Sequence, residues 1–138
     1  INTEYFMCTY GDGVSNVDIR KLCDYHLRSK VLGTVTAIHP EHKLGIVETK
    51  KNGKMASYKK GHKMKDLVHG GFMVFSKGYL DYLKMDDEIE SPFNILSKKD
   101  KMGVFKHNGF WGAVDTYKDL SALNNYWNNG RPWKVWSD

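Results

Sequence analysis

Hydrophobic and polar positions follow two different periods along the chain, and together these predict a mixture of strands and helices. Runs rich in apolar and β-branched residues predict strands at residues 5–10, 31–38, 72–75 and 102–105. Short helices are expected at residues 79–85 and 92–98. Apolar residues that recur every three or four positions from Ile19 to Leu27 predict a helix capped by Ser15 or Asn16. The first 38 residues therefore read as a β-α-β unit.

A predicted β-hairpin carries the most basic stretch of the sequence. Residues 44–50 and 55–60 flank Asn52-Gly53, a dipeptide typical of a type I′ turn with positive φ at both central positions. Seven lysines and no acid lie between Glu48 and Asp66, namely Lys50, Lys51, Lys54, Lys59, Lys60, Lys63 and Lys65. Such a patch attracts phosphate on nucleic acid or on a small substrate, whereas lysines also keep a strand edge soluble. Both interpretations stay open.

The last helix is predicted to begin after Thr116, because Asp119 follows three residues later as in a capping box, and to end before Gly130. The four tryptophans all lie from residue 111 onward, at Trp111, Trp127, Trp133 and Trp136. Tryptophan buries a large area, so these residues are expected to fix the C-terminal tail or to contact a neighbouring subunit.

Composition limits the class of protein. The chain has 138 residues, 41% of them hydrophobic, and a formal net charge of +5, which fits one globular domain. No apolar stretch is long enough to cross a membrane and no signal peptide is visible, so a cytoplasmic protein without a membrane partner is expected. Cys8 and Cys23 lack the spacing of a zinc or redox motif.

Two aspartates are the leading candidates for chemistry. Asp12 lies between glycines directly after the first predicted strand, where open α/β sheets place ligands, and Asp115 precedes the last helix. Each also has an interpretation without function: Asp12 can be an ordinary turn residue, and Asp115 a favourable charge at the start of a helix. Together with phosphate oxygens they would suit magnesium, provided that the fold brings them together. His39-Pro40-Glu41-His42 lacks the helical spacing of a zinc protease motif.

Several segments in one order resemble a known family. They are 9–13 (Thr-Tyr-Gly-Asp-Gly), 17–19 (Val-Asp-Ile), 69–72 (His-Gly-Gly-Phe), 109–111 (Gly-Phe-Trp) with Asp115-Thr116 and Asp119, and the ending 132–136 (Pro-Trp-Lys-Val-Trp). The chain thereby resembles the C-terminal half of glucose-1-phosphate cytidylyltransferases, which are sugar nucleotidyltransferases. The resemblance implies an α/β, partial Rossmann-like fold, with a mixed sheet, flanking helices and a β-hairpin.

The resemblance also implies a reaction and a site. Members of this family use magnesium to join a sugar 1-phosphate to a nucleoside triphosphate, here CTP and glucose 1-phosphate, giving CDP-glucose and pyrophosphate. By this likeness Asp12, Asp115 and Lys60 are catalytic residues, of which the two aspartates bind the metal and Lys60 binds the sugar phosphate. The expected substrate-binding residues are Gly11, Gly13, Lys59, His69, Gly70, Gly71 and Trp111.

Three departures from the family pattern change the expectation. The family's Glu-Lys-Pro motif aligns with Lys59-Lys60-Gly61, so a hydroxyl-accepting acid has become a base, and an asparagine has become His69. The Gly-rich nucleotide loop has no counterpart, so residues 1–138 are expected to form one domain without the N-terminal nucleotide-binding segment. A truncated or degenerate homo-oligomeric enzyme with little activity alone is expected. The alternatives are a non-catalytic self-assembly module and, ranked last, a basic nucleic-acid-binding domain.

Overall fold

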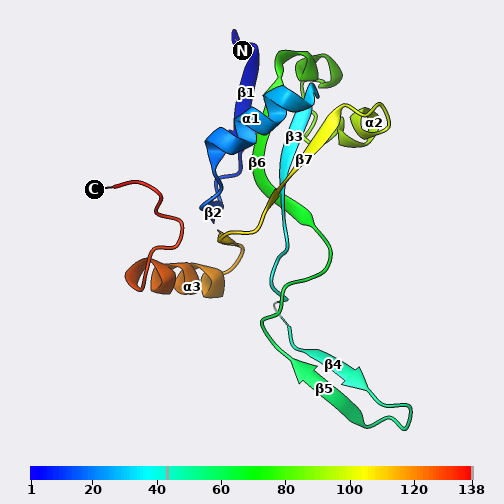
Figure 1. The fold of residues 1–138 in the computed structure, drawn as a ribbon, viewed down its shortest axis with the longest axis vertical. Helices are drawn as coiled ribbons and strands as arrows, with labels where there is room; N and C mark the ends of the chain where they lie inside the picture. The colour runs from blue at the N-terminus through cyan, green and yellow to red at the C-terminus, as the bar shows by residue number, and fades with distance from the viewer. Residues whose placement is uncertain (43, 138) are drawn as a thin grey trace.

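The computed structural model describes residues 1–42 and 44–137, and its centre is a mixed sheet of four strands in the order β1-β6-β3-β7 (Figure 1). The strands are β1 (Tyr5–Thr9), β2 (Gly13–Ser15), β3 (Gly33–Ile38), β4 (Ile46–Thr49), β5 (Met55–Lys59), β6 (Val68–Ser76), β7 (Met102–His107) and β8 (Trp111–Ala113). The helices are α1 (Ile19–Ser29), the 3₁₀ helix η1 (Lys77–Tyr82), α2 (Phe93–Ser97) and α3 (Tyr117–Asn128). The expected α/β class with a mixed sheet and flanking helices is confirmed.

The predicted β-α-β unit has a strand inserted into it. Both β1 and β3 run antiparallel to β6, which lies between them, so β1 and β3 are parallel to each other without touching. Strand β7 then pairs with β3 in parallel. This arrangement leaves β1 and β7 at the two edges of the sheet within the described part of the chain.

Helix α1 packs on the sheet through Leu22 and His26, which are buried. The predicted cap was wrong: Asp18 is the N-cap, and its side chain accepts a hydrogen bond from the Lys21 N–H at 3.0 Å. Ser15 is unavailable because it belongs to β2, where its hydroxyl donates to the Phe110 carbonyl at 2.7 Å. Local spacing could not reveal this pairing, since it joins residues far apart in the sequence.

The main core lies between the sheet and the short helices. It is centred on Met73, Phe75, Tyr79 and Leu96, all of which are buried. The rings of Phe75 and Tyr79 have centroids 4.2 Å apart, and the Tyr79 hydroxyl donates to the Ile89 carbonyl. Burial raises the pKa of Tyr79 to about 12, so this phenol stays protonated and keeps donating. The helix expected at 79–85 is the 3₁₀ helix η1, which starts earlier.

Strands β4 and β5 form the predicted hairpin, and it stands away from the four-stranded sheet (Figure 1). The type I′ turn was wrong, because in the described part of the turn only Gly53 has positive φ, at 78°. The Gly53 N–H donates to the Lys50 carbonyl at 3.0 Å, and the Lys50 N–H to the Lys54 carbonyl at 2.7 Å. The turn is therefore a three-residue loop ending in one left-handed glycine.

Two glycines expected to precede a strand instead lie inside β6. Gly71 has φ of 78°, and the pairing of β3 with β6 shifts register between Val35 and Ala37, opposite this segment. Such a bulge bends a strand and changes the direction of the backbone. The bend gives Gly70 and Gly71 a place beside Tyr10, whose N–H donates to the Gly71 carbonyl at 3.3 Å.

Helix α3 confirms the predicted capping box, with Thr116 and Asp119 bonded reciprocally, but none of its residues is buried. In Figure 1 it lies below β2, apart from the four-stranded sheet. Within residues 1–42 and 44–137, no helix is both long and apolar enough to span a bilayer.

Candidate active site

A small two-stranded ladder brings Asp12 and Asp115 to the same place. Strands β2 and β8 pair antiparallel with Gly13 opposite Ala113. The ladder continues one step beyond the strands, because the Val114 N–H donates to the Asp12 carbonyl at 3.0 Å. Both aspartates line one cavity of about 170 Å³, called here the smaller cavity. The fold therefore brings Asp12 and Asp115 together, which the magnesium hypothesis required.

The backbone of β6 forms one wall of the smaller cavity. The Trp111 indole N–H donates to the Gly70 carbonyl at 2.7 Å, which ties β8 to β6. A Cβ at Gly71 would lie 2.9 Å from Cδ2 of Tyr10, so a side chain at that position would push the Tyr10 ring. Gly13 also lines this cavity, whereas Gly11 precedes Asp12 in the turn and does not. Glycine at position 71 is thus required by both space and backbone conformation.

His69 forms an aromatic corner of the smaller cavity. Its ring meets Tyr10 edge-on at 5.7 Å between centroids and Phe93 at 5.9 Å. Its Nε2 is buried and has no hydrogen-bond partner among the described residues. Burial lowers the pKa of His69, so the ring is held neutral. A neutral imidazole offers one donor and one acceptor to a ligand.

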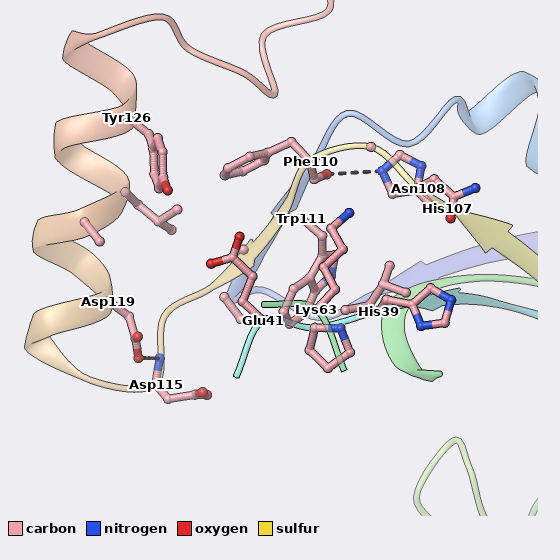
Figure 2. A pocket seen from close by; sticks show the side chains of 17 residues that line it. His39, Glu41, Lys63, His107, Asn108, Phe110, Trp111, Asp115, Asp119 and Tyr126 are labelled. Atoms are coloured by element: carbon pink, nitrogen blue, oxygen red, sulfur yellow. Dashed lines mark hydrogen bonds between the residues drawn. The ribbon is translucent and has the colours of Figure 1, made fainter. Parts of the chain in front are cut away.

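A larger cavity of about 670 Å³ adjoins the smaller one, and the two share Trp111, Ala113 and Asp115. Figure 2 shows this larger cavity between α3 and two paired segments, of which one carries His39 and Glu41 and the other carries Lys63. Phe110 lines part of it, and its ring stacks on Trp133 with the ring centroids 5.3 Å apart. The shared residues make the two cavities neighbouring parts of a single candidate site.

The cap of α3 also fixes the backbone at Asp115. The Asp119 carboxylate accepts from the N–H of Asp115 at 3.3 Å (Figure 2). It also accepts from the N–H of Thr116 at 3.0 Å. The start of α3 and the position of Asp115 are therefore set by the same carboxylate.

The hairpin lysines named by the resemblance lie elsewhere. Lys59 and Lys60 are exposed and line neither cavity. The Lys59 ammonium is 3.2 Å from Oε1 of Glu48, its neighbour on the hairpin. Hydrogen bonds from Ser57 and then Lys59 lower the pKa of Glu48, which keeps this pair charged. Glu41 and Lys63 line the larger cavity but were not among the predicted site residues. They come to face each other only through an antiparallel bridge between two segments that are distant in the sequence.

The donor set of the smaller cavity fits magnesium bound together with phosphate. Within the described residues, no group of three or more His, Cys, Asp or Glu side chains is arranged to hold a metal ion. Mg²⁺ commonly uses one or two carboxylates and takes its remaining ligands from water and substrate phosphates. Asp12 and Asp115 supply that number, so the site would bind the ion with a phosphorylated substrate rather than as a protein cage.

No family model matches the chain, but curated proteins do. It is 36% identical over 140 residues to a probable glucose-1-phosphate cytidylyltransferase of Bacillus subtilis, covering 99% of this chain and 55% of that protein. It is 31% identical over 137 residues to the glucose-1-phosphate cytidylyltransferase of Salmonella typhimurium, covering 96% and 53% respectively. The chain therefore spans about half the length of these relatives.

Solved structures support the same fold. A putative glucose-1-phosphate thymidylyltransferase from Bacillus anthracis, in complex with sucrose, superimposes with a TM-score of 0.67 at 15% identity and covers 93% of this chain. HddC from Yersinia pseudotuberculosis gives a TM-score of 0.62 at 16% identity over 92% of the chain. At these identities the likeness concerns the fold alone, and 56–57% of each of those chains is covered.

Proposed function

Because the chain is homologous to glucose-1-phosphate cytidylyltransferases along almost its whole length, we propose that it forms the metal-binding and sugar-phosphate-binding part of such an enzyme. In the proposed reaction a phosphate oxygen of glucose 1-phosphate attacks the α-phosphorus of CTP. The bond from that phosphorus to the β-phosphate bridging oxygen breaks, so CDP-glucose forms and pyrophosphate leaves. The observation that carries the proposal is the convergence of Asp12 and Asp115 on one cavity.

The residues of this chain would act by positioning and charge. Asp12 and Asp115 would hold Mg²⁺, which supplies neutralisation of the negative charge on the phosphates. The Trp111 ring is fixed by its bond to Gly70 and offers a flat apolar surface to a sugar ring. The bulged backbone at Gly71 allows a ligand to approach without meeting a side chain. No covalent nucleophile is required, because positioning the two phosphates lowers the barrier.

A binding experiment tests the proposal, since the chain spans about half of its relatives. Thermal unfolding is followed with Mg²⁺ and glucose 1-phosphate, CTP or CDP-glucose. Ligand at 100 times its dissociation constant adds about 2.7 kcal/mol, which raises the midpoint by several degrees. We expect a magnesium-dependent rise with CDP-glucose that disappears in Asp12→Asn and Asp115→Asn.

The matched control is Asp24→Asn, because Asp24 is an exposed aspartate on α1 that lines neither cavity. This variant should respond like the wild type. An equal rise in the wild type and in both site variants would refute the assignment of the metal site. The absence of any rise in the wild type would refute ligand binding by this chain.

A second candidate function, self-assembly, is favoured by apolar groups exposed near the C-terminus. Tyr117 is 83% exposed, Val135 72% and Trp136 54%. Trp136 and Val135 belong to the Trp-rich tail, and Tyr117 opens α3, none of whose residues is buried. Burial of such a surface against a second copy would stabilise an oligomer. Association is compatible with the enzymatic proposal, because both can hold for one chain.

A further inference from the structure

A two-stranded neck joins the β4–β5 hairpin to the rest of the molecule and brings two charged residues together. Glu41 faces Lys63 across an antiparallel bridge. Backbone hydrogen bonds of 2.9 and 2.8 Å join residues 40–42 to residues 62–64, one on each side of this facing pair. Glu41 and Lys63 are therefore a non-hydrogen-bonded pair, whose side chains leave the same face and lie closer than in the adjacent pairs.

The neck is held by contacts besides these two bonds. The rings of His42 and His62 stack with centroids 5.2 Å apart and planes 18° apart. The His39 Nδ1 lies 3.0 Å from the Met64 carbonyl oxygen. Glu41 and Lys63 are exposed, and these contacts fix the backbone positions from which their side chains start.

Both side chains of the facing pair line the larger cavity, together with Trp111 and Asp115 (Figure 2). Among the described residues that line it, Lys63 is the only lysine or arginine, whereas Glu41, Asp115 and Asp119 are carboxylates. Among these described residues the Lys63 ammonium is the group that can donate a charge-assisted hydrogen bond to a phosphate.

We infer that Glu41 and Lys63 form the sugar-phosphate subsite of this chain. The Lys63 ammonium binds the phosphate, and the Glu41 carboxylate accepts hydrogen bonds from sugar hydroxyls. These are the tasks that the resemblance gives to the positions of Lys59 and Lys60, which line neither cavity. Lys59 also carries the wrong charge to accept a hydrogen bond. The inference rests on the proposed function, because it names the groups that hold the proposed substrate.

The test measures dissociation constants by NMR titration with two probes, glucose 1-phosphate and inorganic phosphate, both in the presence of Mg²⁺. We expect Lys63→Met to weaken both probes about tenfold or more, because a charge-assisted hydrogen bond to phosphate is lost. Lys63→Arg should restore most of the affinity. Glu41→Gln should weaken glucose 1-phosphate and leave inorganic phosphate unchanged, since only the sugar carries hydroxyls. Amide spectra of each variant check that it is folded.

The matched control is Lys65→Met, because Lys65 is an exposed lysine one residue beyond the neck and lines neither cavity. It should bind both probes like the wild type. Wild-type binding that is insensitive to Lys63→Met, or that is lost in Lys60→Met instead, would overturn the inference and leave the proposed function standing. A wild type that binds neither probe nor CDP-glucose would overturn the inference and the proposed function together.

Discussion

At the scale of single residues, His26 shows how a buried polar group is satisfied. The side chain is 1% exposed, with Nδ1 2.9 Å from the Thr34 hydroxyl and Nε2 3.0 Å from the Ser76 hydroxyl. The Ser76 hydroxyl donates to the Val31 carbonyl at 3.1 Å, so it accepts from the ring. Nε2 therefore carries the proton, and Nδ1 accepts from Thr34.

This arrangement makes stability depend on pH. Burial lowers the pKa of His26, so below about pH 6.5 this histidine binds a proton in the unfolded chain but stays neutral in the folded chain. The free energy of unfolding should fall as pH drops from 7.5 to 5.5, by up to about 1.4 kcal/mol per pH unit from this histidine. Burial lowers the pKa of His69 as well, which adds to the slope in the same direction.

Urea unfolding at several pH values measures this slope. The His26→Gln variant should be less stable at pH 7.5 but should show a shallower dependence on pH. His69→Asn separates the contribution of the second histidine. Parallel pH profiles of the wild type and His26→Gln would contradict the assignment.

At the scale of elements, α3 depends on its cap more than on burial. None of its residues is buried, and its first turn is held by the reciprocal bonds of Thr116 and Asp119. Phe110 contacts it through an edge-on ring pair with Tyr126 at 5.4 Å. A helix with so little buried surface loses much of its stability when the cap is removed.

Replacing Thr116 by alanine should therefore destabilise α3 by about 1 kcal/mol, because one N-terminal N–H loses its acceptor. Hydrogen exchange of the α3 amides should become about fivefold faster, while the amides of β3 and β6 keep their protection. Thr116→Ser keeps the hydroxyl and serves as the control. Equal exchange in the alanine and serine variants would show that the cap contributes nothing.

The sequence predicted those elements whose signal is local and periodic. The strands at β1, β3 and β7 and the helices α1 and α3 follow from apolar spacing and, for α3, from the capping box. The prediction of the α1 cap failed because it depends on a residue distant in the sequence. Ser15 pairs with β8, and Asp18 caps α1 instead. The hairpin turn failed for another reason, because Asn-Gly permits several turns that share one left-handed glycine.

Some residues of the candidate site could likewise be predicted from local sequence signals, and others could not. Asp12 and Asp115 were predicted from their glycine and helix-terminal neighbours, and the fold places both on the lining of one cavity. The sequence placed Lys63 in the basic patch and Glu41 in the His39-Pro40-Glu41-His42 segment, but it did not predict the two as a pair, because no local spacing joins them. They are apparent only when the neck is closed, since the pairing of residues 40–42 with 62–64 creates their shared face.

At the scale of the whole molecule, exposed apolar groups predict association. Trp136 is 54% exposed, and Trp136→Ser should lower the average mass measured by sedimentation over a concentration series. The control is Met85→Ser, because Met85 is 98% exposed and lies outside the tail. A wild type that stays monomeric at all concentrations, or two variants with the same mass distribution, would remove the self-assembly proposal.

The ladder between β2 and β8 has a consequence for the order of events during synthesis. It joins residues 13–15 to residues 111–113, so the loop it closes includes most of the chain. Closing so long a loop costs entropy that only later contacts return, and we expect this step to come late in folding. A nascent chain on the ribosome would contain the residues of β1 and α1 long before Asp115 could reach Asp12. Chains stalled before residue 111 should therefore contain α1 but lack the wall of the smaller cavity that Trp111, Ala113 and Asp115 supply.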